Sequence, residues 1–343
     1  MQYSIRREKL KRFLKKNSFD AFLIQSIYDI LYLTGFFGSY GFLVITEKKS
    51  YLLVDGRYYE EAQKFIDKEL ELILLQDPIK DLKRVLKYVK LVVFDSEDLK
   101  VSFYNKLCEN LQNVRFLPLN SSPIKALRSI KDEEEVRILR EAVKVSKSVF
   151  NNFSKDVSVG LTERELWAKI NYNIELNSQG RSFDTIVLSG KNTSLPHGIP
   201  GDNVIKANDC VLIDYGLKWK NYCSDHTRVI FLGKNNMERY YKIVKKAFKI
   251  ALEQIKPGVE IGKIDRAVKS FFASLGLEKK FVHSTGHGIG LEVHEYPVVN
   301  IKNKDRLKKG MVITVEPGLY FPGEGGVRFE EMVLVTKDGF DVL

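Results

Sequence analysis

The sequence predicts an α+β protein built from two unlike domains. Its 343 residues exceed the length of most single domains. The first third alternates short apolar runs with amphipathic segments, a pattern typical of an α/β domain. The later part has longer apolar runs joined by short turns, which favours an antiparallel sheet covered by helices. A polar stretch at 120–123 separates the two patterns, so we expect domains at 1–122 and 123–343.

The first domain is expected to open with a basic helix whose apolar residues recur at helical spacing. The region 27–45 is apolar but is interrupted by Asp29 and several glycines, which argues against a membrane helix. The remaining pattern predicts a mixed or parallel sheet, with strands at 21–25, 41–46, 51–55, 72–76 and 91–95 and helices at 57–67, 79–88 and 101–111.

The second domain is expected to open with a long charged helix at 131–153. A second helix is expected to begin after Thr162, because Thr162 and Glu165 have the spacing of a capping box. It runs to about residue 177. Beyond it, the pattern predicts strands at 185–189, 210–214, 227–232, 311–316 and 326–336, and helices at 237–254 and 261–274.

Composition points to an ordinary globular protein, with 44% hydrophobic and 29% charged residues. Lys and Arg number 55 against 44 Asp and Glu, a net charge of +11. No nucleic-acid motif accompanies this charge, so we expect a solvated basic surface and no nucleic-acid partner. There is no signal-peptide core, and the three cysteines show no paired spacing. These features predict a reduced cytoplasmic protein without a membrane partner.

The residues suited to chemistry cluster in the second domain. All five histidines lie between positions 197 and 294, and acidic residues end or follow its apolar strands: Asp214, Asp225, Glu316 and Glu330. One strand-end carboxylate often only caps a turn, but four such residues together favour a shared function. Asp214 and Asp225 are eleven residues apart around a turn, so a hairpin would bring them together.

Four clustered carboxylates repel one another unless a counter-charge is present. Two divalent cations would balance the four negative charges, and one histidine would complete the ligand set. Oxygen-rich ligation with an imidazole suits manganese, cobalt, iron or zinc. The residues therefore predict a dinuclear metal site.

The run from His283 to Glu295, HSTGHGIGLEVHE, closely resembles the signature of proline-specific metallopeptidases of the aminopeptidase P and prolidase group. Asp55-Gly56-Arg57-Tyr58 is similar to the smaller N-terminal domain of these enzymes. Further segments resemble the group in order and spacing from about residue 125 to the end: 196–198, 213–216, 224–228, 310–318 and 326–330.

The resemblance implies a "pita-bread" catalytic domain, a curved antiparallel sheet flanked by two helix pairs. It also implies cleavage of the N-terminal residue from Xaa-Pro peptides, by a hydroxide held between two metal ions. Asp214 would bind one metal, and His287 and Glu316 the second. Asp225 and Glu330 would bridge both. Two divalent ions per chain are expected, manganese first, with cobalt, zinc or iron as alternatives.

The same resemblance implies roles for residues around the metals. Glu316 would shuttle protons, and His294 would stabilise the tetrahedral intermediate or handle a proton. His197 and His283 would contact the substrate, and Arg328 would support the bridging carboxylate or the substrate. His226 lies where the group usually has an apolar or variable residue, so a structural role is expected for it. The implied partners are small peptides with proline second, and a second copy of the chain in a homodimer.

Several alternatives stay open beside this interpretation. The main one is a non-catalytic member of the fold that binds peptides or nucleic acid, supported only by the net charge. Creatinase-type chemistry is disfavoured because all five ligands are present, and methionine aminopeptidase because of the GHGIGLEVHE run and the extra domain. Val298 leaves no arginine after Pro297, which weakens a strict dipeptidase assignment. The sequence does not separate dipeptidase from aminopeptidase. The group pattern also commonly has aspartate at Glu331 and isoleucine at Phe329.

Overall fold

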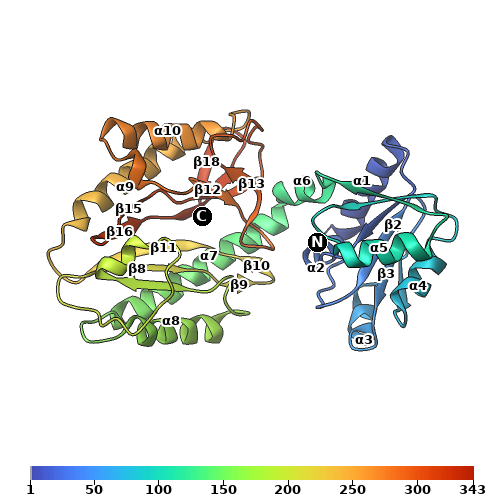
Figure 1. Cartoon of the computed structure of the whole chain (residues 1–343), viewed down its shortest axis with the longest axis horizontal. Coiled ribbons are helices and arrows are strands. Elements are labelled where there is room, and N and C mark those ends of the chain that lie inside the picture. The colour runs from blue at the N-terminus through green and yellow to red at the C-terminus, as the bar shows by residue number, and fades with distance from the viewer. Residues whose placement is uncertain (1) are drawn as a thin grey trace. The chain divides into compact units, whose positions relative to one another are not determined.

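The computed structural model describes residues 2–343 and divides into two compact units between Arg128 and Ser129 (Figure 1). The first unit contains a six-stranded sheet in the order β4-β3-β2-β1-β5-β6. Its antiparallel pairs are β1 with β2 and β2 with β3, while β1 with β5, β3 with β4 and β5 with β6 are parallel. The predicted mixed sheet is confirmed.

The elements of the first unit follow in chain order. The strands are β1 (Ala21–Ile24), β2 (Phe42–Thr46), β3 (Ser50–Val54), β4 (Leu70–Leu74), β5 (Leu91–Asp95) and β6 (Arg115–Leu119). The helices are α1 (Tyr3–Lys16), α2 (Ile27–Thr34), α3 (Tyr59–Ala62), α4 (Pro78–Val85), α5 (Val101–Asn110) and α6 (Pro123–Ser129).

One helix of this unit is shorter than predicted, and α2, β6 and α6 were missed. The helix expected at 57–67 is only α3 plus a 3₁₀ turn to Phe65, because Ala62 alone is buried there and a short helix needs packing to form. Helix α2 was missed, although Ser26 accepts from the Asp29 amide at its start and Gly35, at φ +82°, ends it. Strand β6 was also missed. Its Pro118 is tolerated because β6 lies at the sheet edge.

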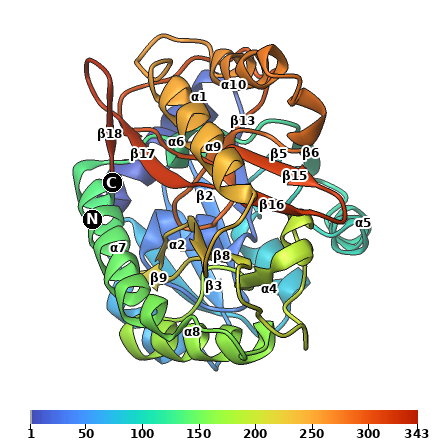
Figure 2. The same cartoon turned by 90° about the vertical axis from the view of Figure 1, so that its left-hand side faces the viewer.

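The second unit places strands between two pairs of helices (Figures 1 and 2). The helices are α7 (Glu133–Phe153), α8 (Glu163–Asn177), α9 (Met237–Leu252) and α10 (Gly262–Ser274). The sheet strands are β7 (Ile186–Ser189), β8 (Cys210–Tyr215), β11 (His226–Phe231), β12 (Gly286–Gly288), β13 (Glu295–Val299), β14 (Val312–Val315), β17 (Glu331–Val335) and β18 (Phe340–Val342). Two short pairs, β9 (Lys218–Trp219) with β10 (Tyr222–Cys223) and β15 (Gly318–Phe321) with β16 (Gly325–Arg328), complete it.

Two antiparallel sheets, in the orders β11-β8-β7 and β13-β12-β14-β17-β18, form the body of this unit. Helices α7 and α8 cover the first sheet, where Phe153 and Ile170 pack with Val211 and Ile213. Helices α9 and α10 pack on the second, where Phe272 belongs to the core that includes Ile313. Burial of these apolar faces is the main stabilising contribution, at about 25 cal/mol per Å² removed from water. The predicted pita-bread architecture is confirmed.

Helix α8 begins as the sequence predicts, with reciprocal capping between Thr162 and Glu165. The strand expected at 326–336 was wrong in one respect, because the chain breaks at Phe329–Glu330. β16 pairs with β15 before the break, and β17 pairs with β14 and β18 after it. The break matters because it releases Glu330 from either strand ladder.

All three cysteines are free, with Cys210 and Cys223 buried and Cys108 exposed. Across residues 2–343, no helix combines the length and the apolar character that crossing a membrane requires.

Candidate metal centre

The candidate ligands come from both sheets of the second unit. Asp214 lies in β8, paired in register with Thr227 of β11, and Asp225 directly precedes β11. His287 lies in β12, Glu316 follows β14, and Glu330 lies in the break before β17. The hairpin expected between Asp214 and Asp225 is present. The chain therefore brings residues more than a hundred positions apart into one cluster.

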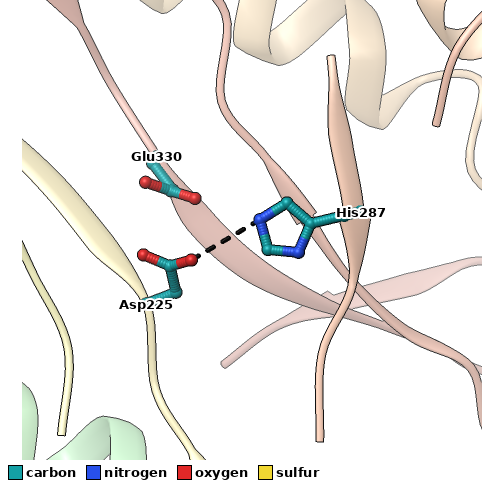
Figure 3. Close-up of side chains that lie close together, drawn as sticks. All are labelled: Asp225, His287 and Glu330. Carbon is teal, nitrogen blue, oxygen red and sulfur yellow. Dashed lines mark ion pairs between the residues drawn. The ribbon is translucent and has the colours of Figure 1, made fainter. Parts of the chain in front are cut away.

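Asp225, His287 and Glu330 form the tightest group (Figure 3). One ligand atom from each lies within 4.8 Å of the others, and all three residues are buried. Glu316 borders the group, with Oε1 3.6 Å from His287 Nε2. Asp214 borders it as well, and its Oδ1 is a buried oxygen without a hydrogen-bond partner among the described residues.

The His287 ring has a defined orientation. Nδ1 donates a hydrogen bond to the Gly288 carbonyl at 3.0 Å, so the neutral ring carries its lone pair on Nε2. Burial, assisted by His294, lowers the pKa of His287 to about 4, which keeps the ring neutral at pH 7. Nε2 nevertheless faces Asp225 Oδ2 at 3.5 Å. A lone pair facing a carboxylate is unfavourable unless a cation lies between them.

The buried carboxylates show the same imbalance. Burial, and then the charge of Glu330, raises the pKa of Asp225 well above its usual value. Burial and the charge of Glu316 likewise raise the pKa of Glu330. Burial, reinforced by Asp214 and opposed by Arg328, raises the pKa of Glu316 to about 8. This cluster therefore disfavours its own negative charge in the absence of added cations.

Arg328 supplies one positive charge to this region and is itself 3% exposed. Its Nη2 donates to Asp214 Oδ2 at 2.7 Å and its Nε to Thr227 Oγ1 at 2.9 Å. Nη1 donates to the Tyr320 hydroxyl at 2.7 Å, and that hydroxyl donates to His283 Nε2 at 2.9 Å. His283 Nδ1 donates to the Ser284 carbonyl. A continuous hydrogen-bond chain thus connects Asp214 to His283.

The two remaining predicted site residues, His197 and His294, are exposed. The His294 ring lies 4.3 Å from that of His287, centroid to centroid. Partial burial and the neighbouring His197 lower the pKa of His294, which also indicates that His197 is close by. These two imidazoles lie near the carboxylate cluster but stay accessible to solvent.

Some contributing residues were missed by sequence reasoning. Tyr320 and Thr227 support the cluster through side-chain contacts between distant segments. Glu163, fully buried in α8, accepts from the amides of Ser189 and Gly201 and so holds the loop that contains His197. Only its position N1 of a helix with a capping box was visible in the sequence, and that position does not indicate such a role.

The residues present fit divalent cations. The group offers carboxylate oxygens and one imidazole nitrogen, which suit transition-metal dications. Asp225, Glu330 and His287 converge on one point, and Asp214 retains an unpartnered buried oxygen. One guanidinium does not neutralise four carboxylates, so added positive charge would relieve the repulsion described above.

Comparisons with known proteins agree with this geometry. Residues 137–337 match the model of metallopeptidase family M24, and residues 6–130 match the creatinase/prolidase N-terminal domain. The chain belongs to metallopeptidase family M24. It is a metallopeptidase, and the resemblance to the aminopeptidase P and prolidase group is confirmed.

Among M24 relatives, the chain is 35% identical to an Xaa-Pro dipeptidase of Pyrococcus horikoshii, over 98% of this chain and 96% of that protein. Two solved structures are also similar. An X-Pro aminopeptidase from Thermotoga maritima superposes with a TM-score of 0.91 at 32% identity, covering 98% of this chain and 96% of that one. An Xaa-Pro dipeptidase from Bacillus anthracis gives 0.94 at 31% identity, covering 99% and 97%.

Proposed function

We propose that this M24 enzyme hydrolyses the bond before proline in small Xaa-Pro peptides, using two divalent cations per chain. The observation that carries the proposal is the buried Asp225–His287–Glu330 group, whose histidine lone pair faces a carboxylate. Relatives named as Xaa-Pro dipeptidase and X-Pro aminopeptidase, each covered almost end to end, support the substrate class.

Five side chains would hold the cations: Asp214, Asp225, His287, Glu316 and Glu330. Asp225 and Glu330 would bridge the two cations, as the resemblance to the aminopeptidase P and prolidase group implies, and one oxygen of each lies within 4.8 Å of the other. Bound there, the cations would polarise the scissile carbonyl and activate water for the attack. Manganese is the proposed ion.

The other residues would orient and move protons around the scissile bond. Glu316, whose pKa is already raised by burial, is suited to accept a proton and return it to the leaving nitrogen. Exposed His294 would donate a hydrogen bond to the developing oxyanion. His197 and His283 would contact the peptide. Arg328 is committed to Asp214, Thr227 and Tyr320, so its proposed role is to support the ligand carboxylate.

The decisive assay compares matched Xaa-Pro and Xaa-Ala peptides with the purified protein loaded with manganese, cobalt or zinc. We expect Xaa-Pro bonds to be cleaved much faster. Comparable rates on both would contradict the proline specificity while leaving peptidase activity intact. Xaa-Pro dipeptides against Xaa-Pro-Xaa tripeptides would assign the enzyme as dipeptidase or aminopeptidase.

We also propose that the enzyme is a cytoplasmic homodimer. Sedimentation analysis at micromolar concentration tests the oligomeric state, and fractionation of the source cells tests the location.

A further inference from the structure

The two halves of the candidate metal centre belong to separate sheets. Asp214 lies in the β11-β8-β7 sheet and Asp225 directly before β11, whereas His287 lies in β12, and Glu316 and Glu330 directly follow and precede strands of the other sheet. Among the described strands, no ladder of backbone hydrogen bonds joins β11 to β17. Side-chain contacts between these strands therefore contribute to fixing how far Asp225 lies from Glu330.

Strand alternation places two kinds of contact on opposite faces of β11. Thr227 faces the cluster, and its hydroxyl donates to Glu330 Oε2 at 2.7 Å. His226 and Arg228 face away from it, on the same side as their partners Tyr215 and Ile213, which pack against α7 and α8. On that far face, His226 and Arg228 meet Glu331, the residue directly after Glu330.

Glu331 contacts both residues of β11 at once. Its Oε2 lies 3.3 Å from His226 Nδ1, and its Oε1 accepts a hydrogen bond from Arg228 Nη2. Arg228 Nη1 also donates to the Glu330 carbonyl at 2.7 Å. Lys147 of α7 adds a second positive group, with Nζ 3.8 Å from Glu331 Oε2, while burial lowers the pKa of His226 and favours its neutral ring. His226 is fully buried and Glu331 is 8% exposed, so water screens these contacts little.

We propose that Glu331 is a positioning residue for the metal centre, acting with His226 and Arg228. By tying the start of β17 to β11, it sets the separation between Asp225 and Glu330, each adjacent in sequence to a member of this group. This inference rests on the metal binding of the proposed function and adds a role outside the ligand set. It also replaces the structural role expected for His226.

The test uses the full-length protein and Mn²⁺ alone. Glu331→Gln keeps the size of the side chain but removes the charge that pairs with Arg228 and faces His226. We expect at least one Mn²⁺ to bind about 10–100-fold more weakly, the range typical when a residue that orients a ligand is changed. Glu331→Asp keeps the charge, so its Mn²⁺ affinity should lie closer to that of the unchanged protein.

Glu141→Gln is the matched control. Glu141 belongs to the same unit and also pairs with several donors, including Trp219 Nε1 and Lys220 Nζ at 3.0 Å, but it touches neither β11 nor β17 through them. Its substitution should leave Mn²⁺ affinity unchanged. The melting temperature of each metal-free variant, measured in parallel, reports any general loss of folding.

Three results would overturn the inference. The first is Mn²⁺ affinity of Glu331→Gln within about twofold of the unchanged protein. The second is a loss of Mn²⁺ affinity in Glu331→Gln that is matched either by the control Glu141→Gln or by the charge-conserving Glu331→Asp. The third is an unchanged protein that binds no Mn²⁺, since there would then be no centre to position. If Glu331→Gln does not fold, Arg228→Gln takes its place, because it breaks the same Arg228–Glu331 contact from the other side and should weaken Mn²⁺ binding to a similar extent. Normal Mn²⁺ binding without Xaa-Pro cleavage would refute the proposed function instead and leave this result standing.

Discussion

Replacing Asp225 by Asn should change the stability of the metal-free and metal-loaded protein in opposite directions. The substitution keeps the shape of the side chain and removes one negative charge from a buried group. Without metal, that charge is repelled by Glu330, whose ligand oxygen lies within 4.8 Å. At an effective dielectric constant of about 20, two full charges at this separation repel by ~3.5 kcal/mol.

Partial protonation reduces this repulsion, because burial and Glu330 already raise the pKa of Asp225. We therefore expect metal-free Asp225→Asn to be more stable than the unchanged metal-free protein near pH 8. The expected gain is about 1–3 kcal/mol, less than the value for two full charges. For a unit of this size, each kcal/mol moves the melting temperature by about 2–4 °C.

With metal, the order should reverse. A ligand at about 1,000 times its dissociation constant stabilises the folded state by about 4.1 kcal/mol, and the variant should lose at least one ion. Calorimetric melting at pH 8 of stripped and Mn²⁺-loaded samples, with elemental analysis of dialysed protein, measures both effects. Asp98→Asn is the control, because Asp98 is a half-buried carboxyl of the first unit that accepts from the Gln25 amide. Its effect on stability should be the same with and without metal.

A role for Asp225 as a simple turn cap makes the opposite prediction. Loss of a cap costs roughly 0.5–2 kcal/mol whether or not metal is present. A variant that is destabilised equally in both states, and that keeps its full metal content, would refute the charge-balance reasoning.

Two further predictions concern Glu316 and His294. Burial raises the pKa of Glu316 from 4.5 to about 8 in the metal-free protein, so folding favours its protonated form. The stability that this group contributes is fully present below pH 4.5 and is lost as the pH rises through about 8. Urea titrations at pH 5 and pH 9 measure the free energy of unfolding, and Glu316→Gln should reduce the difference between the two values. If the substitution leaves this pH dependence of the unfolding free energy unchanged, Glu316 is not its source. His294→Ala should lower kcat on an Xaa-Pro peptide by about 10²–10⁴-fold while metal content stays normal; a variant that loses metal would show that His294 acts as a ligand.

The sequence predicts this protein best where function is local in the chain. The run around His287 and the acidic strand ends are contiguous patterns, so Asp214, Asp225, Glu316 and Glu330 can be identified as a set from the sequence alone. Elements with strong periodicity, such as α7 and α8, were predicted to within two or three residues. The helix α2 was missed because it is short and nearly all of it is buried, so it lacks the amphipathic pattern that marks surface helices.

Contacts between sheets were beyond reach of the sequence. Nothing in the residues around Thr227 or Tyr320 indicates that their hydroxyls meet Glu330 and Arg328. The break at Phe329–Glu330 was also missed, because apolar and polar residues alternate from Val327 to Glu330 as in a continuous strand. The break shapes the site because three neighbouring residues point in different directions there. Arg328 contacts Asp214, Glu330 faces the cluster, and Glu331 contacts β11.

The candidate metal centre therefore lowers the stability of the metal-free fold. Buried, mutually repelling carboxylates destabilise the metal-free state, and their raised pKa values express that cost. The apolar faces covered by α7 and α8 and by α9 and α10 offset this cost, because their burial does not involve the ligand residues. Arg328 offsets part of the repulsion through Asp214, and the contacts of Glu331 hold the strands that the repulsion would separate. Such a cluster favours cation binding strongly. Bound cations offset the repulsion between carboxylates that the surrounding fold keeps close together.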